Sequence, residues 1–335
     1  MILIAGATGY VGRYLAVTLH NAGRDVLALG RNREVEAFFC EQGVPFQRFD
    51  LLNDADYDAL PTENIEAIVN LAVCLPEHEA PIERFFDVNT KGNYKLLEFA
   101  RRNGVRRFVM ASTHKVYYDI CAPVITEDML PSFIGPHSPY IISKLTAEHF
   151  MSYYGKDFQM DTITLRFTGV HGYGALMGYL DKEGNYTRTA SEWFIEKAVR
   201  GEPIEVWGDM SIRRDHVYIK DVVGALTAAI DAPAGTKGIY NVASGVGHNQ
   251  YEDAVAIAKA FQTDKGVSSV TLCPEKPGLT RGYVYSIEKI RRDMGWEPQY
   301  CDLDKLYADY RAEWERKLFH NYFYIKPECK PISFE

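Results

Sequence analysis

A tyrosine and a lysine separated by one helical turn are the residues of this sequence best suited to proton transfer. Tyr140 and Lys144 stand in the segment YIISK, and their spacing places both side chains on one face of a helix. A nearby ammonium group favours the phenolate and lowers a tyrosine pKa from about 10 toward neutral pH. We therefore predict that Tyr140 is the acid or base of a hydroxyl–ketone interconversion.

The spacing by itself does not select this pair. It occurs twice more, in Tyr285 with Lys289 and in Tyr322 with Lys326. Tyr140 differs from the other two tyrosines because it follows the predicted strand Phe108–Ala111, and a doubly wound sheet binds its ligands at the carboxyl ends of its strands. We interpret the two later pairs as surface pairs of the C-terminal lobe.

Two hydroxyl side chains come directly after this same predicted strand. Ser112 and Thr113 follow the apolar run FVMA. Either hydroxyl is suited to hydrogen-bond a substrate oxygen, and either is equally suited to cap a turn.

A glycine-rich segment near the N-terminus predicts a dinucleotide site. Gly6, Gly9 and Gly12 have the spacing GxxGxxG in GATGYVG, between a predicted strand and a predicted helix. The first glycine permits a sharp turn, the second lets the backbone approach a pyrophosphate, and the third lets helix and strand pack closely. The free N–H groups and the helix dipole then favour the phosphates. A purely structural turn is the alternative interpretation.

The end of the second predicted strand bears on the choice of dinucleotide. NAD-binding folds usually place an acid there to accept a hydrogen bond from the ribose 2′-hydroxyl. This chain has LGRNR at that point, without an acid. Gly30 leaves room for a 2′-phosphate, and Arg31 and Arg33 are able to pair with it, unless both are solvated loop residues. The segment favours NADP over NAD.

Short apolar runs alternate with helical patterns in the N-terminal half. The predicted strands are Ile2–Ala5, Val26–Leu29, Ile68–Leu71, Phe108–Ala111 and Ile163–Phe167, with Ile239–Val242 returning late to the same sheet. The predicted helices are Val11–Ala22, Glu34–Gln42 and Glu83–Asn103. This alternation predicts an α/β fold with a Rossmann-type doubly wound parallel sheet and a smaller C-terminal substrate-binding lobe.

The domain boundaries follow from changes of pattern along the chain. We assign residues 1–170 to an NAD(P)-binding domain, to which 208–245 partly return, and residues 171–335 mainly to the substrate-binding lobe. Residues 172–190, rich in Gly, Tyr and polar side chains, are predicted to form a long loop. The aromatic segment Phe319–Tyr324 is expected to pack either on the body of the protein or on a partner.

Composition excludes several classes of protein. The 335 residues include 37 basic and 45 acidic side chains, so a net charge of −8 gives no footprint of a nucleic-acid binder. We find no signal peptide and no membrane span.

Six scattered cysteines without CxxC spacing indicate a reducing, cytoplasmic setting. His171, His216 and His248 lack metal-ligand spacing, so no metal site is predicted and we interpret them as structural.

The order of the motifs resembles that of a known family. From Met1 to about Pro298 the chain is similar to the extended short-chain dehydrogenases/reductases, and within them to the NAD(P)-dependent nucleotide-sugar epimerases and dehydratases. The matching segments are GATGYVG, Asp50-Leu51, Asn70-Leu71-Ala72, Asn89, Ser112–Tyr117, Tyr140 with Lys144, Leu165-Arg166-Phe167, Gly208-Asp209, Arg214-Asp215-His216 with Asp221, Tyr240-Asn241-Val242 and Met294–Pro298.

This resemblance implies a set of roles. Thr113, Tyr140 and Lys144 would be catalytic, with hydride passing between nicotinamide C4 and a sugar carbon while Tyr140 moves the hydroxyl proton. The residues implied for the cofactor, NADP or NAD, are Gly6, Thr8, Gly9, Tyr10, Val11, Gly12, Arg31, Asn32, Arg33, Asp50, Leu51, Leu71, Ala72, Asn89, Tyr140, Lys144 and Phe167. Those implied for a nucleotide-sugar substrate are Ser112, Thr113, Arg214, Lys276 and Arg281. A homodimer is the expectation for this family, through helices near 83–103 and 140–154.

The sequence departs from the family pattern at functional positions. His114 and Lys115 replace the acidic residues that follow the catalytic Thr in family dehydratases, which disfavours sugar 4,6-dehydration. Gly169 replaces a common Asn, and Lys276 stands where many members have Arg. Both changes weaken the expected contact with a nucleotide diphosphate.

Three hypotheses follow. The first is an NAD(P)-dependent epimerase or reductase of a nucleotide-linked sugar, since both activities use the same catalytic residues. The second is an NADPH-dependent reductase of a non-nucleotide carbonyl compound, which a thermal-shift panel of nucleotide sugars would distinguish. The third is a non-catalytic NADP(H)-binding sensor, for which the Tyr140–Lys144 pair would be superfluous.

Overall fold

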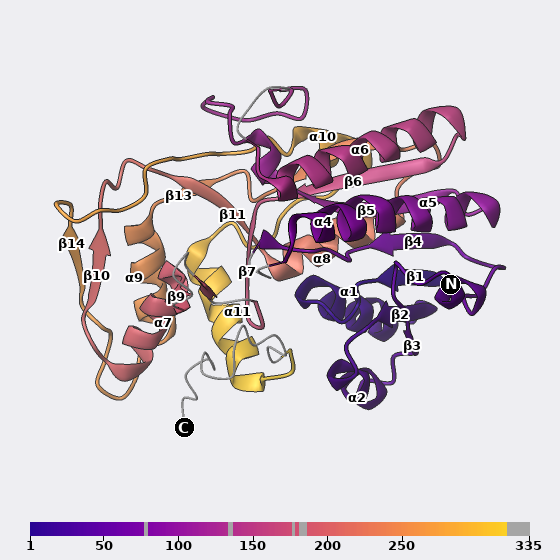
Figure 1. The fold of residues 1–335 in the computed structure, drawn as a ribbon. Helices are drawn as coiled ribbons and strands as arrows, with labels where there is room; N and C mark the ends of the chain where they lie inside the picture. Colours follow the sequence, from indigo (N-terminus) through magenta and orange to yellow (C-terminus); the bar gives the residue numbers. More distant parts are fainter. Residues whose placement is uncertain (77–79, 133–136, 176–177, 181–185, 320–335) are drawn as a thin grey trace.

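A large lobe and a small lobe make up the protein (Figure 1). The computed structural model describes residues 1–76, 80–132, 137–175, 178–180 and 186–319. The large lobe contains a seven-stranded sheet built of β1 (Ile2–Ala5), β2 (Val26–Gly30), β3 (Phe46–Arg48), β4 (Ala67–Asn70), β5 (Arg107–Thr113), β6 (Asp161–Phe167) and β12 (Gly238–Val242).

All neighbouring strands of this sheet are parallel, in the order β12-β6-β5-β4-β1-β2-β3. The predicted Rossmann-type sheet is therefore confirmed, including the late strand, which pairs with β6 at the edge. The short strand β3 was not predicted, because its three residues (FQR) carry no run of apolar side chains.

Helices cover both faces of the sheet. Successive residues of a strand point to opposite sides, so alternate side chains of one strand pack against different helical layers. Ile2 and Ile4 pack with α1 (Tyr10–Asn21), α2 (Glu34–Glu41) and α8 (Ile219–Ile230). Leu3 and Ala5 belong to the other core, which includes residues of α5 (Asn93–Arg102) and α6 (Pro139–Asp157) and, beside the short helix α3 (Asp54–Asp58), Leu51 and Leu60. The strand ends thus project between two helical layers.

The long helix predicted at Glu83–Asn103 has three parts. α4 (Ile82–Phe85) continues into the π-helical segment η2 (Phe86–Gly92) and then into α5. A π-helical turn holds an extra residue and often marks a functional site. Here it carries Asn89, whose side-chain amide accepts a hydrogen bond from Cys74 N at 2.8 Å and donates one to Cys74 O at 3.1 Å. The π-helical segment therefore braces the loop that follows β4.

The small lobe is built from segments that leave the large lobe more than once. β7 (Gly169–His171), β11 (Arg214–Tyr218) and β13 (Gly247–His248) form one sheet, and β10 (Ile204–Trp207) pairs with β14 (Val270–Cys273). The helices α7 (Ala190–Arg200), α9 (Gln250–Ala260) and α11 (Leu303–Arg316) complete this lobe (Figure 1), while α10 (Glu288–Met294) lies against β12.

Two segments differ from or refine the sequence-based expectations. The loop predicted at 172–190 is not wholly irregular, because β8 (Gly178–Leu180) and β9 (Tyr186–Arg188) pair as antiparallel strands. Of the aromatic segment 319–324, the structure describes only Phe319, whose ring stacks on Tyr14 with centroids 3.6 Å apart. Phe319 thus packs on the body of the protein.

None of the helices in the described part of the chain is long and apolar enough to cross a membrane.

Candidate functional site

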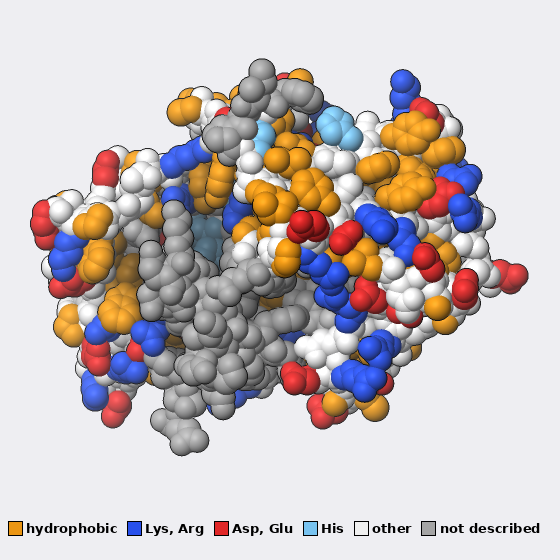
Figure 2. Space-filling view, in the orientation of Figure 1, with side chains coloured by type: hydrophobic (Ala, Val, Ile, Leu, Met, Phe, Trp, Pro, Cys, Tyr) orange, Lys and Arg blue, Asp and Glu red, His pale blue; other side chains and the backbone are white. Residues whose placement is uncertain are grey.

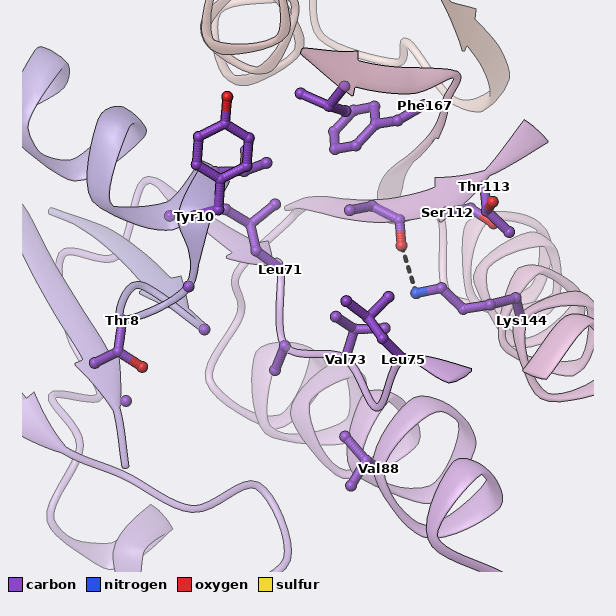
Figure 3. A pocket seen from close by; sticks show the side chains of 18 of the residues that line it. Thr8, Tyr10, Leu71, Val73, Leu75, Val88, Ser112, Thr113, Lys144 and Phe167 are labelled. Atoms are coloured by element: carbon purple, nitrogen blue, oxygen red, sulfur yellow. Dashed lines mark hydrogen bonds between the residues drawn. The ribbon is translucent and has the colours of Figure 1, made fainter. Parts of the chain in front are cut away.

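A cavity of about 440 Å³ opens at the carboxyl ends of the central strands. Its walls come from the turns after β1, β2, β4 and β5, from the start of α6 and from the end of β6 (Figure 3). Of the predicted site residues, those that line it are Gly6, Thr8, Gly9, Tyr10, Val11, Gly12, Arg31, Asp50, Leu51, Leu71, Ala72, Ser112, Thr113, Tyr140, Lys144 and Phe167.

The glycine-rich turn has no room for side chains at two positions. A Cβ on Gly6, whose φ is +79°, would lie 2.5 Å from Ala72 N, and a Cβ on Gly12 would lie 2.4 Å from Gly6 O. Gly9 is the N-cap of α1 and offers no side-chain cap. The first N–H groups of α1 therefore have no partner within the helix and no capping side chain, and they border the cavity. This cradle fits the pyrophosphate of a dinucleotide.

At the end of β2, one of the two predicted arginines reaches the cavity. Arg31 lines it, with its side chain 56% exposed and its Nη1 atom 3.6 Å from a carboxylate oxygen of Asp50. Arg33 is exposed and begins α2, and Asn32 accepts a hydrogen bond from Glu34 N; neither lines the cavity. The space beside Gly30 is also not empty, because a Cβ there would lie 2.4 Å from Thr8 Cγ2.

Tyr140 and Lys144 are placed by the start of α6. Ser138 caps this helix by accepting from Ile141 N, and Pro139 occupies its first turn. Both functional side chains are about 95% buried. Lys144 Nζ donates to Ala111 O at 2.7 Å (Figure 3). Burial lowers the pKa of Lys144 to about 8, while Glu148 acts in the opposite direction.

The two hydroxyl residues after β5 have different partners. Thr113 Oγ1 accepts from Lys115 N at 3.2 Å and so caps the 3-10 helix η3 (His114–Tyr117). This bond does not use the hydroxyl proton of Thr113. Ser112 Oγ instead donates to Glu148 Oε1 at 2.6 Å. The Ser112 proton is thus committed to a carboxylate, and Thr113 is the better placed of the two to donate to a substrate oxygen.

The positions of the dehydratase acids hold a neutral histidine and a lysine. His114 and Lys115 both line the cavity, and Lys115 Nζ lies 5.9 Å from the centre of the Tyr140 ring. His114 Nδ1 lies 2.9 Å from Tyr285 Oη. Burial lowers the pKa of His114 to about 3, so the imidazole is neutral at physiological pH.

The interpretation of Tyr285 and Lys289 as a surface pair was wrong. Tyr285 is 2% exposed, and its hydroxyl reaches His114 from a segment 171 residues away. A bridge to Ile125 and a hydrogen bond from Tyr285 N to Asp215 hold this segment against the site. Tyr322 and Lys326 lie outside the described residues.

The three cations predicted to bind substrate do not line the cavity. Arg214 Nε donates to Arg281 O at 3.0 Å, and its guanidinium lies over the ring of Tyr283. Arg281 donates to backbone carbonyls at the end of η3 and just after it, those of Tyr117 and Ile120. Lys276 pairs with Glu205 on the far β10–β14 edge. Arg214 and Arg281 adjoin the wall that carries His114, whereas Lys276 is remote from it.

Several residues of the site were not predicted from the sequence. Val73, Leu75 and Val88 form an apolar part of the cavity wall (Figure 3). Glu148 and Arg166 form a buried ion pair behind Lys144 at 2.6 Å. The signal for Glu148 was its place one helical turn after Lys144. Asn89 does not line the cavity but braces its wall from behind, through Cys74.

The histidines interpreted as structural lie together in the small lobe. The ring centroids of His171 and His216 are 4.2 Å apart, and those of His216 and His248 are 5.8 Å apart. Burial lowers the pKa values of His171 and His216 to about 3. Within the described ranges, no three His, Cys, Asp or Glu side chains form a group suited to a metal ion, and five cysteines are free thiols.

Comparison with known proteins gives consistent matches. The model of the NAD dependent epimerase/dehydratase family matches residues 2–243. A UDP-glucose 4-epimerase of Mycolicibacterium smegmatis is 29% identical over 305 residues, covering 89% of this chain and 93% of its own. The structure of the Thermus thermophilus UDP-glucose 4-epimerase in complex with NAD superimposes with a TM-score of 0.70 at 27% identity, covering 93% of this chain and 98% of that one.

A further structural neighbour carries the other dinucleotide. The structure of RMD from Pseudomonas aeruginosa, complexed with NADPH, has a TM-score of 0.70 at 23% identity and covers 94% of this chain and 99% of its own. Structures that share this fold therefore include a complex with NAD and a complex with NADPH.

Proposed function

The chain belongs to the NAD dependent epimerase/dehydratase family, and from this premise we propose that it moves a hydride to or from a hydroxyl-bearing carbon of a nucleotide-linked sugar. The observation that carries this proposal is that one cavity is lined both by the glycine cradle and by Thr113, Tyr140 and Lys144. A cofactor held in the cradle would extend toward the part of the cavity wall that carries those three side chains.

The residues of the cradle and the neighbouring strand ends would hold the cofactor. Gly9 and Gly12 would face the pyrophosphate, Asp50 the adenine, and Lys144 the nicotinamide ribose. When bound, NAD(P) supplies the hydride acceptor or donor. We propose NADP as the preferred form because Arg31 lies at the cavity and is the residue suited to pair with a 2′-phosphate.

Tyr140 would move the proton. Its Oη atom would take the proton of the substrate hydroxyl during oxidation and return it during reduction. The Lys144 ammonium group, charged at pH 7 because its pKa is about 8, would favour the Tyr140 phenolate. Thr113 would orient the substrate oxygen by donating a hydrogen bond to it from its hydroxyl group.

The same wall argues against dehydration. Removal of water from a sugar needs an acid–base residue beside the leaving hydroxyl, and neutral His114 with Lys115 provides no carboxylate there. We propose epimerase or reductase chemistry instead.

We also propose that two copies associate through η2, α5 and α6. These elements expose large apolar side chains, and Figure 2 shows a gathering of such side chains over this part of the molecule. The residues are Phe86, Tyr94, Ile142 and Tyr153, together with Phe158 directly after α6. A contiguous apolar surface of this kind typically marks a protein–protein interface.

The free thiols are consistent with our assignment to the cytoplasm.

Two experiments test the proposed function. Mass spectrometry of the dinucleotide released on denaturation identifies the cofactor: NADP(H) supports our assignment, and stoichiometric NAD⁺ overturns the preference for NADP. Turnover of UDP-, GDP-, CDP- and dTDP-sugars is then compared between the wild type, Tyr140→Phe and Tyr153→Phe. Tyr140→Phe should lower turnover by ~10² or more, and Tyr153→Phe, on the same helix but exposed, should not.

A second candidate function is the reduction of a non-nucleotide carbonyl compound. It is favoured by one observation: Lys276 and Arg281, both expected to bind a nucleotide-sugar substrate, are engaged by Glu205 and by backbone carbonyls. A thermal-shift response to NADPH, without a response to any nucleotide sugar, would support this candidate.

A further inference from the structure

A buried carboxylate that the proposed chemistry does not use lies directly behind Lys144. Glu148 follows Lys144 by one turn of α6 and is 4% exposed. Its Oε1 atom accepts from Ser112 Oγ at 2.6 Å and from Arg166 Nε at 3.0 Å, and its Oε2 atom accepts from Arg166 Nη2 at 2.6 Å. The carboxylate therefore joins α6 to two strands.

The two strands are neighbours at this point. Ser112 on β5 is paired in register with Arg166 on β6. The residue before Ser112 is Ala111, whose carbonyl accepts from Lys144 Nζ at 2.7 Å. Two residues of α6, one turn apart, thus hold two consecutive residues of β5. This double attachment sets the position of α6, and with it Tyr140, relative to the end of β5.

The attachment extends across the sheet through Arg166. The Arg166 guanidinium lies 4.6 Å over the ring of Tyr117, and Tyr117 Oη donates to Asn241 Oδ1 on β12 at 2.9 Å. Tyr117 closes η3, which begins directly after Thr113. The ion pair therefore supports both segments that carry the proposed reacting groups.

Glu148 also balances the charge of the site. Lys144 shares α6 with Tyr140 and Glu148, while His114 and Lys115 of η3 line the same cavity and Arg166 of β6 pairs with Glu148. Among these five, Glu148 is the only carboxylate. Burial disfavours the Lys144 ammonium group, and the Glu148 charge opposes that effect.

We propose that Glu148 is a positioning residue of the acid–base site, which clamps α6 onto β5 and β6 and supplies the negative charge that holds the Lys144 ammonium group beside Tyr140. Ser112 then belongs to this clamp and not to the substrate-binding set. The proposal rests on the proposed function, because it takes Tyr140 as the proton-moving group.

The variants are chosen to separate charge from structure. Glu148→Gln alone leaves the buried Arg166 cation without a partner, which can prevent folding. Glu148→Gln combined with Arg166→Met removes both charges and leaves the net charge unchanged. Glu148→Asp keeps the carboxylate but shortens its reach, and Ser112→Ala removes one hydrogen bond while keeping both charges.

The readout is the titration of Tyr140 in the dinucleotide-bound protein, which needs no substrate. Each variant is compared with the same variant carrying Tyr140→Phe, and the difference in ultraviolet tyrosinate absorbance gives the Tyr140 midpoint. We expect Glu148→Gln/Arg166→Met to raise this midpoint by about one pH unit or more, because Lys144 loses its charge earlier. Glu148→Asp, which keeps both charges, should leave it within a few tenths of a unit of the wild type, and Ser112→Ala, which removes one bond of the clamp but keeps both charges, should raise it by less than the double variant does.

Turnover separates this proposal from a merely structural role. We expect kcat of the double variant at pH 7 to fall by ~10-fold or more, with KM little changed. A folded double variant that binds dinucleotide normally and keeps the wild-type midpoint would overturn the proposal, as would an Asp variant as impaired as the double variant. If Tyr140→Phe removes no titration and no turnover from the wild type, the proposed function itself fails.

Discussion

Replacing Lys144 by Met is expected to stabilise the protein while removing its activity. Lys144 is 4% exposed, and burial lowers its pKa from 10.5 to about 8. Below pH 8 Lys144 is charged in both the folded and the unfolded protein, but the folded protein binds the Lys144 proton more weakly. At 1.4 kcal/mol per unit, this difference costs about 3 kcal/mol of folding free energy.

The variant removes that cost together with one hydrogen bond. The bond from Lys144 Nζ to Ala111 O contributes about 1 kcal/mol. We expect a net gain of about 2 kcal/mol in the free energy of unfolding at pH 7, measured by urea denaturation of the cofactor-free protein. The wild type should become more stable as the pH rises from 8 toward 10.5, because its penalty disappears there. Lys144→Met should lack this rise.

Activity should change in the opposite direction. Loss of a neighbouring cation raises a phenol pKa by about 1 to 3 units, so the phenolate fraction of Tyr140 at pH 7 falls by ~10- to 10³-fold. The kcat of Lys144→Met should fall by the same factor and recover partly at high pH. Lys156→Met, an exposed lysine of the same helix, is the control and should change neither quantity. An unaltered pH–rate profile would refute the acid–base reasoning, and a less stable variant would refute the burial reasoning.

Three further perturbations test other parts of the molecule. Gly12→Ala places a Cβ 2.4 Å from Gly6 O and should weaken NAD(P)H binding by ~10-fold or more, measured by fluorescence titration; normal binding would show that the turn adapts. Arg31→Ala should weaken NADPH binding by ~10-fold or more but leave NADH binding unchanged, whereas Arg33→Ala should affect neither; equal losses for both cofactors would contradict the assignment to the 2′-phosphate. Ile142→Asp, at a side chain 43% exposed on α6, should convert a dimer to monomers in sedimentation velocity; a wild type that sediments as a monomer would exclude the proposed interface.

His114 connects the cavity wall to a distant segment of the chain. His114 and Lys115 border the cavity beside Thr113, and Tyr285, which does not itself line the cavity, contacts His114 from behind this wall.

Local patterns in the sequence were sufficient for the parts of this protein that depend on neighbours in the chain. The glycine spacing of residues 6–12 defines a strand–turn–helix unit, and the steric demand at Gly12 comes from Gly6 and Ala7 within the same turn, although the demand at Gly6 comes from Ala72 after β4. Tyr140 and Lys144 share a helix face because four residues make about one turn. The alternation of strands and helices likewise gave the parallel sheet, since a βαβ connection permits little else.

Tertiary structure alone decided which distant residues meet at the site. Tyr285 is 171 residues from His114, and the contact between them follows from how the small lobe folds back on β11. Glu148 finds Ser112 and Arg166 because β5 and β6 are adjacent in the sheet, which no spacing in the sequence reports. Conversely, Lys276 belongs to a motif that suggested a ligand contact, yet its segment lies on the β10–β14 edge beside Glu205. Spacing determines which side chains share an element, whereas packing between elements determines which of them share a cavity.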